Sequence, residues 1–159
     1  MDRLHHDPER RSPFGAAVRR REDARLVTGR GSYVSDVELP RMLHVAFVRS
    51  VHAHARLKGI DTSAALAAPG VVAVLTGDDP AVSRYRLRAK SALASYVETE
   101  QPALAAPKVR YCGEAVAAVV GTDRYTVEDA SLLVQVDYAP LPATVDALEA
   151  MRAGAPAVH

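Results

Sequence analysis

Two histidines, His52 and His54, are the residues in this 159-residue chain whose types and spacing best suit a metal site. Residues two apart on an extended chain point to the same side, so both imidazoles could face one ion. No carboxylate or thiolate nearby in the sequence completes a ligand set. Because two ligands alone make a weak site, the pair favours a structural or interface role over metal binding.

The other candidates for chemistry have simpler explanations. Cys112 is the one cysteine, which excludes an internal disulfide and is typical of a reducing cytoplasm. Asp78 and Asp79 precede a proline, where turns commonly place aspartate. Gly29 and Gly31 lack the third glycine of a dinucleotide loop. We therefore assign no catalytic, cofactor-binding or metal-binding residue.

A basic edge is the most charged feature of the segment 81–107, which has no sustained period. Every second residue from 84 to 90 is basic: Arg84, Arg86, Arg88 and Lys90. On an extended chain these side chains would share one side, which suits an anion or a docking partner. The favoured alternative is that these residues belong to a solvent-exposed loop. A loop of this length in a compact domain is usually functional or disordered.

Composition excludes several classes of function. The chain is 48% hydrophobic and 25% charged, with a net charge of +1, so general attraction to nucleic acid or to an anionic membrane is not expected. No apolar run approaches the roughly 20 residues that span a bilayer. The amino end is polar where a secretion signal would be apolar, which favours the cytoplasm. Without tryptophan and with 5% aromatic residues, the core must be built mainly from Val, Leu and Ala.

The elements expected from the sequence centre on residues 115–120, a run of small and β-branched residues that predicts a strand buried on both faces. Strands are also expected at 42–50, 55–60, 71–76, 108–111 and 134–138, and helices at 61–70, 123–133 and 146–153. In the strand 42–50, either Leu43, Val45 and Phe47 or Ala46 and Val48 could face inward. This order predicts an α+β fold, a mixed sheet with two or three helices packed against it. Residues 1–13 are expected to form a disordered leader and 14–159 one domain.

Several ordered stretches carry a family resemblance. They are residues 22–33, with Asp36 and 39–40 after them; then 47–56, 60–61, 69–76 and 108–114; and finally 128–130 and 136–142. In sequence and in order they resemble the α/β hammerhead domain of the large subunit of the molybdenum hydroxylases, the family of xanthine dehydrogenase, aldehyde oxidase and carbon monoxide dehydrogenase. Ala115 stands where a proline commonly follows the Gly-Glu pair, and Cys112 where an ordinary side chain is usual.

The resemblance implies a non-catalytic component. In the family, molybdopterin and the catalytic glutamate belong to a longer region that follows this domain, and the iron–sulfur and FAD sites lie elsewhere in the complex. The resemblance therefore implies no cofactor on this chain and molybdenum in a partner. The expected partner is a molybdopterin-binding large-subunit chain, with an iron–sulfur subunit as a further candidate.

Three hypotheses follow from these observations. The first is a hammerhead subunit that docks on a separate molybdenum-binding chain, with Arg49, His52, His54 and Glu114 as candidates for the polar rim of the docking face. The second is a free-standing interaction or small-ligand module that uses the basic edge. The third is a truncated fragment, since residues 156–159 end without a capping feature.

Overall fold

The computed structural model describes residues 20–159, which belong to two units, one ending at Pro40 and one running from Arg41 to His159. The first unit contains the short helix α1 (Asp23–Val27) and the 3-10 helix η1 (Val34–Asp36). Neither helix buries a side chain. The boundary predicted between residues 13 and 14 lies outside the described residues.

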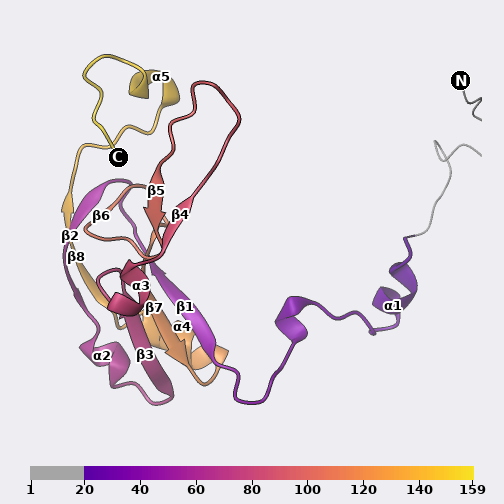
Figure 1. Ribbon diagram of the computed structural model, residues 1–159. Helices are drawn as coiled ribbons and strands as arrows, with labels where there is room; N and C mark the ends of the chain where they lie inside the picture. Colours follow the sequence, from indigo (N-terminus) through magenta and orange to yellow (C-terminus); the bar gives the residue numbers. More distant parts are fainter. Residues whose placement is uncertain (1–19) are drawn as a thin grey trace, which may run out of the picture. The chain divides into compact units, whose positions relative to one another are not determined.

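The centre of the second unit is a three-stranded antiparallel sheet (Figure 1). Its strands are β1 (His44–Arg49), β7 (Ala115–Gly121) and β3 (Val71–Thr76), in the order β1-β7-β3. In the inner strand β7, residues 116–119 are all buried. The strand predicted at 115–120 is therefore confirmed, and it is the one against which both neighbours pair.

The remaining strands form two further sheets. One contains β6 (Lys108–Val109), β2 (Ala55–Asp61) and β8 (Gln135–Pro140), in that order, and the other pairs β4 (Arg86–Arg88) with β5 (Glu100–Pro102). All pairings in residues 20–159 are antiparallel. The predicted α+β class is confirmed, with three antiparallel sheets where one mixed sheet was expected. Alternation in a strand determines which side chains share a face, but it does not name the neighbouring strand.

Helix α4 (Arg124–Ser131) is the longest helix of this unit and covers one face of the central sheet. The carboxylate of Asp123 accepts a hydrogen bond from the Thr126 amide at 2.9 Å, which caps the first turn. Val127 and Ala130 then pack in the same core cluster as Ala117 and Val119 of β7. The predicted helix is thus confirmed, together with its cap.

Three other helices are single turns: α2 (Ser63–Leu66), α3 (Pro80–Ser83) and α5 (Ala147–Ala150). The first and last are shorter than the predicted helices 61–70 and 146–153. Asp61 remains the last residue of β2, and its carboxylate accepts a hydrogen bond from the Ser63 amide at 2.9 Å. In residues 20–159 no helix has the length and hydropathy needed to cross a membrane.

The structure also decides which face of β1 is inward. Ala46 and Val48 pack against the core cluster beneath α4, whereas Val45 and Phe47 remain 50% and 48% exposed. A second core cluster joins Ala55, Ala105, Val109 and Val116. Both clusters consist of Val and Ala, as expected for a chain poor in aromatic residues.

Candidate partner-docking site

Arg49 lies at the point where β1 leaves the central sheet. The register between β1 and β7 shifts between Val48 and Arg49, so the strand bends there. The guanidinium of Arg49 donates a hydrogen bond to the Gly113 carbonyl at 2.9 Å and lies 5.6 Å from the centre of the Phe47 ring. Arg49 is exposed, so its charge is held beside an apolar ring at the protein surface.

Ser50 ties this bend to the turn before β7. Its amide donates to the Glu114 carbonyl at 2.9 Å, and its carbonyl accepts from the Gly113 amide at 2.8 Å. The Ser50 hydroxyl donates to the carbonyl of His52 at 2.9 Å and accepts from the His52 amide at 3.0 Å. Gly113 has φ of +90°, a conformation that glycine adopts without a steric penalty. The two segments are therefore locked together by backbone hydrogen bonds.

Glu114 is an interior residue, 5% exposed. Its carboxylate accepts a hydrogen bond from the Arg110 amide and lies 3.5 Å from the Arg110 guanidinium. That guanidinium also donates to the Lys108 carbonyl at 3.1 Å. Burial of a carboxylate requires such partners, since an unpaired buried charge is strongly unfavourable. In this structure, Glu114 stabilises the turn between β6 and β7.

The two predicted histidines contact the segment at and after the end of β8. The Nδ1 atom of His54 donates to the Pro142 carbonyl at 2.7 Å, and the His54 carbonyl accepts from the Leu141 amide at 2.9 Å. The His52 ring lies 4.9 Å from the Tyr138 ring, tilted by 60°. His54 is buried, and its Nε2 atom has no hydrogen-bond partner among the described residues.

Burial raises the pKa of the Tyr138 phenol, whereas a hydrogen bond with Ser50 acts in the opposite direction and lowers it.

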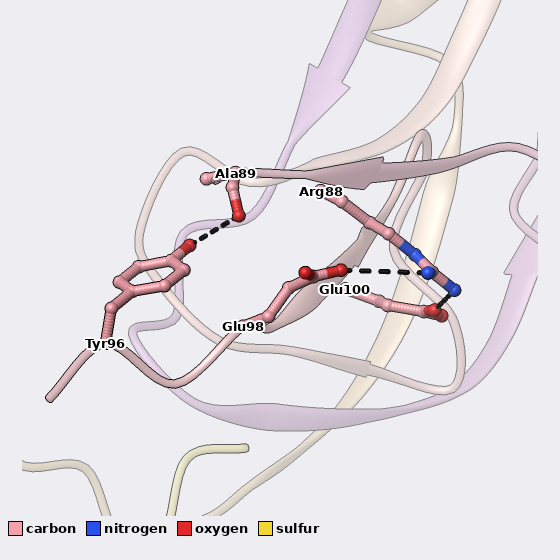
Figure 2. Close-up of polar contacts among 5 residues, drawn as sticks. All are labelled: Arg88, Ala89, Tyr96, Glu98 and Glu100. Carbon is pink, nitrogen blue, oxygen red and sulfur yellow. Dashed lines mark hydrogen bonds and ion pairs between the residues drawn. The ribbon is translucent and has the colours of Figure 1, made fainter. Parts of the chain in front are cut away.

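The basic edge lies elsewhere, at the end of α3, on β4 and on the loop that follows. Figure 2 shows one of its residues, Arg88, with the side chains of Glu98 and Glu100 beside it. Arg88 pairs with Glu100 on the facing strand and approaches Glu98 at 3.7 Å. The Tyr96 hydroxyl donates to the Ala89 carbonyl at 2.7 Å and closes the same hairpin. Arg88 is therefore paired with carboxylates, which lowers the positive charge of the edge.

Arg84, Arg86 and Lys90 are exposed as well. The Arg84 guanidinium donates to the Tyr85 hydroxyl at 3.2 Å and lies 5.0 Å from the ring centre, and Arg86 donates to the Ser83 carbonyl. Of residues 84–90, only 86–88 form a strand, and Arg84 caps the end of α3. Arg84 and Arg86 thus bind neutral oxygens and keep their net charge available.

The structure brings together some of the predicted residues and separates others. Arg49 and Glu114 meet at one turn, and His52 follows it directly. Among residues 20–159, no three His, Cys, Asp or Glu side chains gather as metal ligands would. The docking role of Arg49, His52, His54 and Glu114 stays a prediction. Sequence reasoning missed Ser50 and Tyr138, since neither a lone serine nor a strand tyrosine signals a long-range contact.

Comparison with known proteins assigns the domain. Residues 28–142 match the family described as the aldehyde oxidase and xanthine dehydrogenase a/b hammerhead domain. The carbon monoxide dehydrogenase large chain of Afipia carboxidovorans is 49% identical over 148 residues, which are 93% of this chain and 18% of that one.

Solved structures agree with this assignment. The crystal structure of the Cu,Mo-CO dehydrogenase in its carbon monoxide reduced state aligns with a TM-score of 0.75 at 45% identity, over 89% of this chain and 17% of that chain. The quinoline 2-oxidoreductase of Pseudomonas putida 86 aligns with a TM-score of 0.73 at 46% identity, over 80% of this chain and 16% of that chain. The present chain therefore spans less than a fifth of the length of these relatives.

Proposed function

Because the chain belongs to the family of aldehyde oxidase and xanthine dehydrogenase hammerhead domains, which form part of molybdenum hydroxylase large subunits, we propose that it is the non-catalytic hammerhead component of a molybdopterin-dependent oxidoreductase. In this proposal it docks on a separate molybdopterin-binding chain in the cytoplasm. The partner supplies the molybdenum chemistry, while iron–sulfur centres and FAD belong to other parts of the complex.

One structural observation carries the non-catalytic part of the proposal: the groups that could do chemistry at the candidate site are engaged in holding the fold. The carboxylate of Glu114 pairs with Arg110, and Nδ1 of His54 binds the Pro142 carbonyl. In the part of the chain that the structure describes, no three His, Cys, Asp or Glu side chains gather as metal ligands would. In this proposal molybdopterin and its metal belong to the partner, as the family resemblance implies.

The reaction class follows from the relatives. One is a carbon monoxide dehydrogenase and another a quinoline 2-oxidoreductase. The complex would therefore oxidise carbon monoxide or hydroxylate an aldehyde, a purine or another heterocycle. This domain would contribute to that reaction by completing the fold of the molybdenum-binding partner.

Co-expression tests the proposal. The partner used is the Afipia carboxidovorans carbon monoxide dehydrogenase large chain from which the 148-residue matching segment has been deleted. We expect a complex that elutes as one species on size exclusion, with molybdenum in the partner and none in the present chain purified alone. Failure of the wild-type chain to co-purify would contradict the proposal. So would retained molybdenum, or aldehyde oxidation, by the chain alone.

A second function, a free-standing module that binds an anion or a partner through the basic edge, is favoured by the net charge of Arg84 and Arg86, whose guanidinium groups bind neutral oxygens. The triple variant Arg84→Ala, Arg86→Ala, Lys90→Ala separates the two functions. Under the first proposal the variant still assembles with the molybdopterin-binding chain. Under the second, the variant loses binding of the anion or partner that the basic edge holds. Neither the wild type nor the variant then assembles with the molybdopterin-binding chain.

A further inference from the structure

Among residues 20–159, helices α4 and α2 cover one side of the central sheet, while Val45 and Phe47 on the opposite side are about half exposed. On the covered side, Ala117 and Val119 of β7 are fully buried, and Val127 of α4 and Ala65 of α2 belong to the same core cluster. Directly paired residues of an antiparallel sheet share a face, and successive residues alternate. The side chains on the opposite side of β7 are therefore those of Ala118 and Val120. Ala118, between its paired neighbours Phe47 and Leu75, is 6% exposed and Val120 is half-buried, and neither belongs to a core cluster.

The opposite side is apolar across all three strands, and we call it the open face. Phe47 of β1 and Leu75 of β3 both pair with Ala118, and Val45 and Ala73 both pair with Val120. The open face therefore consists of Val45, Phe47, Ala73, Leu75, Ala118 and Val120. When one face of an antiparallel sheet is exposed to water, its strands usually alternate between apolar side chains on the buried face and polar side chains on the exposed face. None of these six residues is polar, and Val45 and Phe47 are about half exposed in residues 20–159.

The edge of the open face carries a positive charge. The Arg49 guanidinium lies over the Phe47 ring at 5.6 Å and is held there by its hydrogen bond to the Gly113 carbonyl. Phenylalanine and arginine are both enriched at protein interfaces relative to the rest of the surface. An apolar centre with a charged rim is likewise the anatomy of a specific protein interface.

The length of the related large chains indicates which partner would cover the open face. In the crystal structure of the Cu,Mo-CO dehydrogenase, the matching domain is 17% of one chain, so more than four fifths of that chain lies outside the region described here. An apolar sheet face packs against a second layer in a folded domain, and among residues 20–159 the helices α2 and α4 supply such a layer on one face of this sheet. Resting on the proposed function, we propose that the open face is the docking surface for the molybdopterin-binding remainder of the large chain, and that Arg49 meets a carboxylate of that partner.

Charge substitution on the open face tests this assignment. The variant Phe47→Glu places a carboxylate at the centre of the face, and Phe47→Ala removes the ring without adding charge. The control is Leu66→Glu in α2, which makes the same apolar-to-acidic change at a residue of matched exposure (49% against 48%), on the element that covers the opposite side of the sheet. Thermal unfolding verifies that each variant is folded. If Phe47→Glu does not fold, the binding test uses Phe47→Ala in its place.

Affinity for the segment-deleted Afipia carboxidovorans large chain is measured by calorimetry or by retention on the immobilised partner. We expect Phe47→Glu to weaken binding at least tenfold, Phe47→Ala to weaken it less, and Leu66→Glu to bind as wild type does. Wild-type protein that does not bind would overturn the proposed function itself. The docking surface is elsewhere if Phe47→Glu binds the partner as tightly as wild type does. The same conclusion follows if Leu66→Glu loses as much affinity as Phe47→Glu. A wild-type dimer that Phe47→Glu dissociates would make a second copy the occupant and overturn the inference.

Discussion

At the residue scale, the carboxylate of Glu114 illustrates how an interior charge is tolerated. Its side chain is 6% exposed and that of Arg110 14%, so water screens the pair weakly. The variant Glu114→Ala would leave the Arg110 guanidinium in the interior without its carboxylate, and the Arg110 amide without its acceptor. Removal of one partner of a buried pair costs about 3 kcal/mol. We expect a loss of this size in the free energy of unfolding, measured by urea denaturation.

The control for this prediction is Glu128→Ala on α4. Glu128 accepts a hydrogen bond from Arg124 at 2.8 Å, but both side chains are exposed to water. Exposed pairs at this spacing contribute little. The control variant should therefore unfold at the same urea concentration as wild type. Equal stability of Glu114→Ala and wild type would mean that water solvates the interior pair and that the turn does not depend on it.

Tyr138 gives a second residue-scale prediction, on the response to alkaline pH. Burial raises the pKa of Tyr138 above the value of about 10 for a free tyrosine, so the folded protein holds the phenol proton more tightly than the unfolded chain does. The free energy of unfolding must then fall as the pH rises from about 10 through the folded-state pKa. In Tyr138→Phe this contribution is absent, and the alkaline decline between pH 9 and 12 should be shallower. A decline as steep as that of wild type would show that Tyr138 titrates as in the unfolded chain.

At the scale of elements, the contact between β7 and α4 depends on a glycine. A Cβ atom added at Gly121 would lie 2.7 Å from Cγ1 of Val127 and 2.9 Å from the Gly70 carbonyl oxygen. The backbone carbonyl cannot move aside, so we expect Gly121→Ala to cost about 1–3 kcal/mol by overpacking. Gly59→Ala in β2 is the matched control, since nothing lies within 4 Å of its Cβ position. Thermal unfolding of both variants tests the contact; equal melting temperatures would contradict it.

Elements also differ in how far the sequence predicts them. The strand β7 follows from its unbroken run of small and β-branched residues, and α4 from the cap at Asp123. The strands β4 and β5 were not expected, because three-residue strands are too short to show a period. In β1, Ala46 and Val48 on one side and Val45 and Phe47 on the other are all apolar, so alternation alone left the inward face undecided.

The candidate site was predictable only in part, for a similar reason. The segments around Arg49 and Glu114 were found through their resemblance to a family, and their proximity depends on hydrogen bonds between residues more than 60 positions apart. Partners at such a separation are decided by how strands pair. The open face likewise follows from the register of β1, β7 and β3, which one strand's sequence does not contain.

At the scale of the whole molecule, stability should be distributed unevenly. Strand β7 has hydrogen-bonded neighbours on both edges and buried side chains along most of its length. Among the described strands, β4 and β5 pair only with each other, and the residues of β4 are exposed. Figure 1 shows this hairpin extending away from the central sheet. Segments with few buried apolar contacts open locally, whereas core strands open only when the whole unit unfolds.

Amide hydrogen exchange measures this distribution directly. We expect the amides of β7 to exchange with a free energy equal to that of global unfolding from urea denaturation, and those of β4 and β5 to exchange much faster through local opening. Gly121→Ala should then speed exchange in β7 by the same free energy that it removes from global stability, while exchange in β4 and β5 stays unchanged, because the hairpin opens without the core. If the variant also speeds exchange in the hairpin, the hairpin and the central sheet unfold as one cooperative unit.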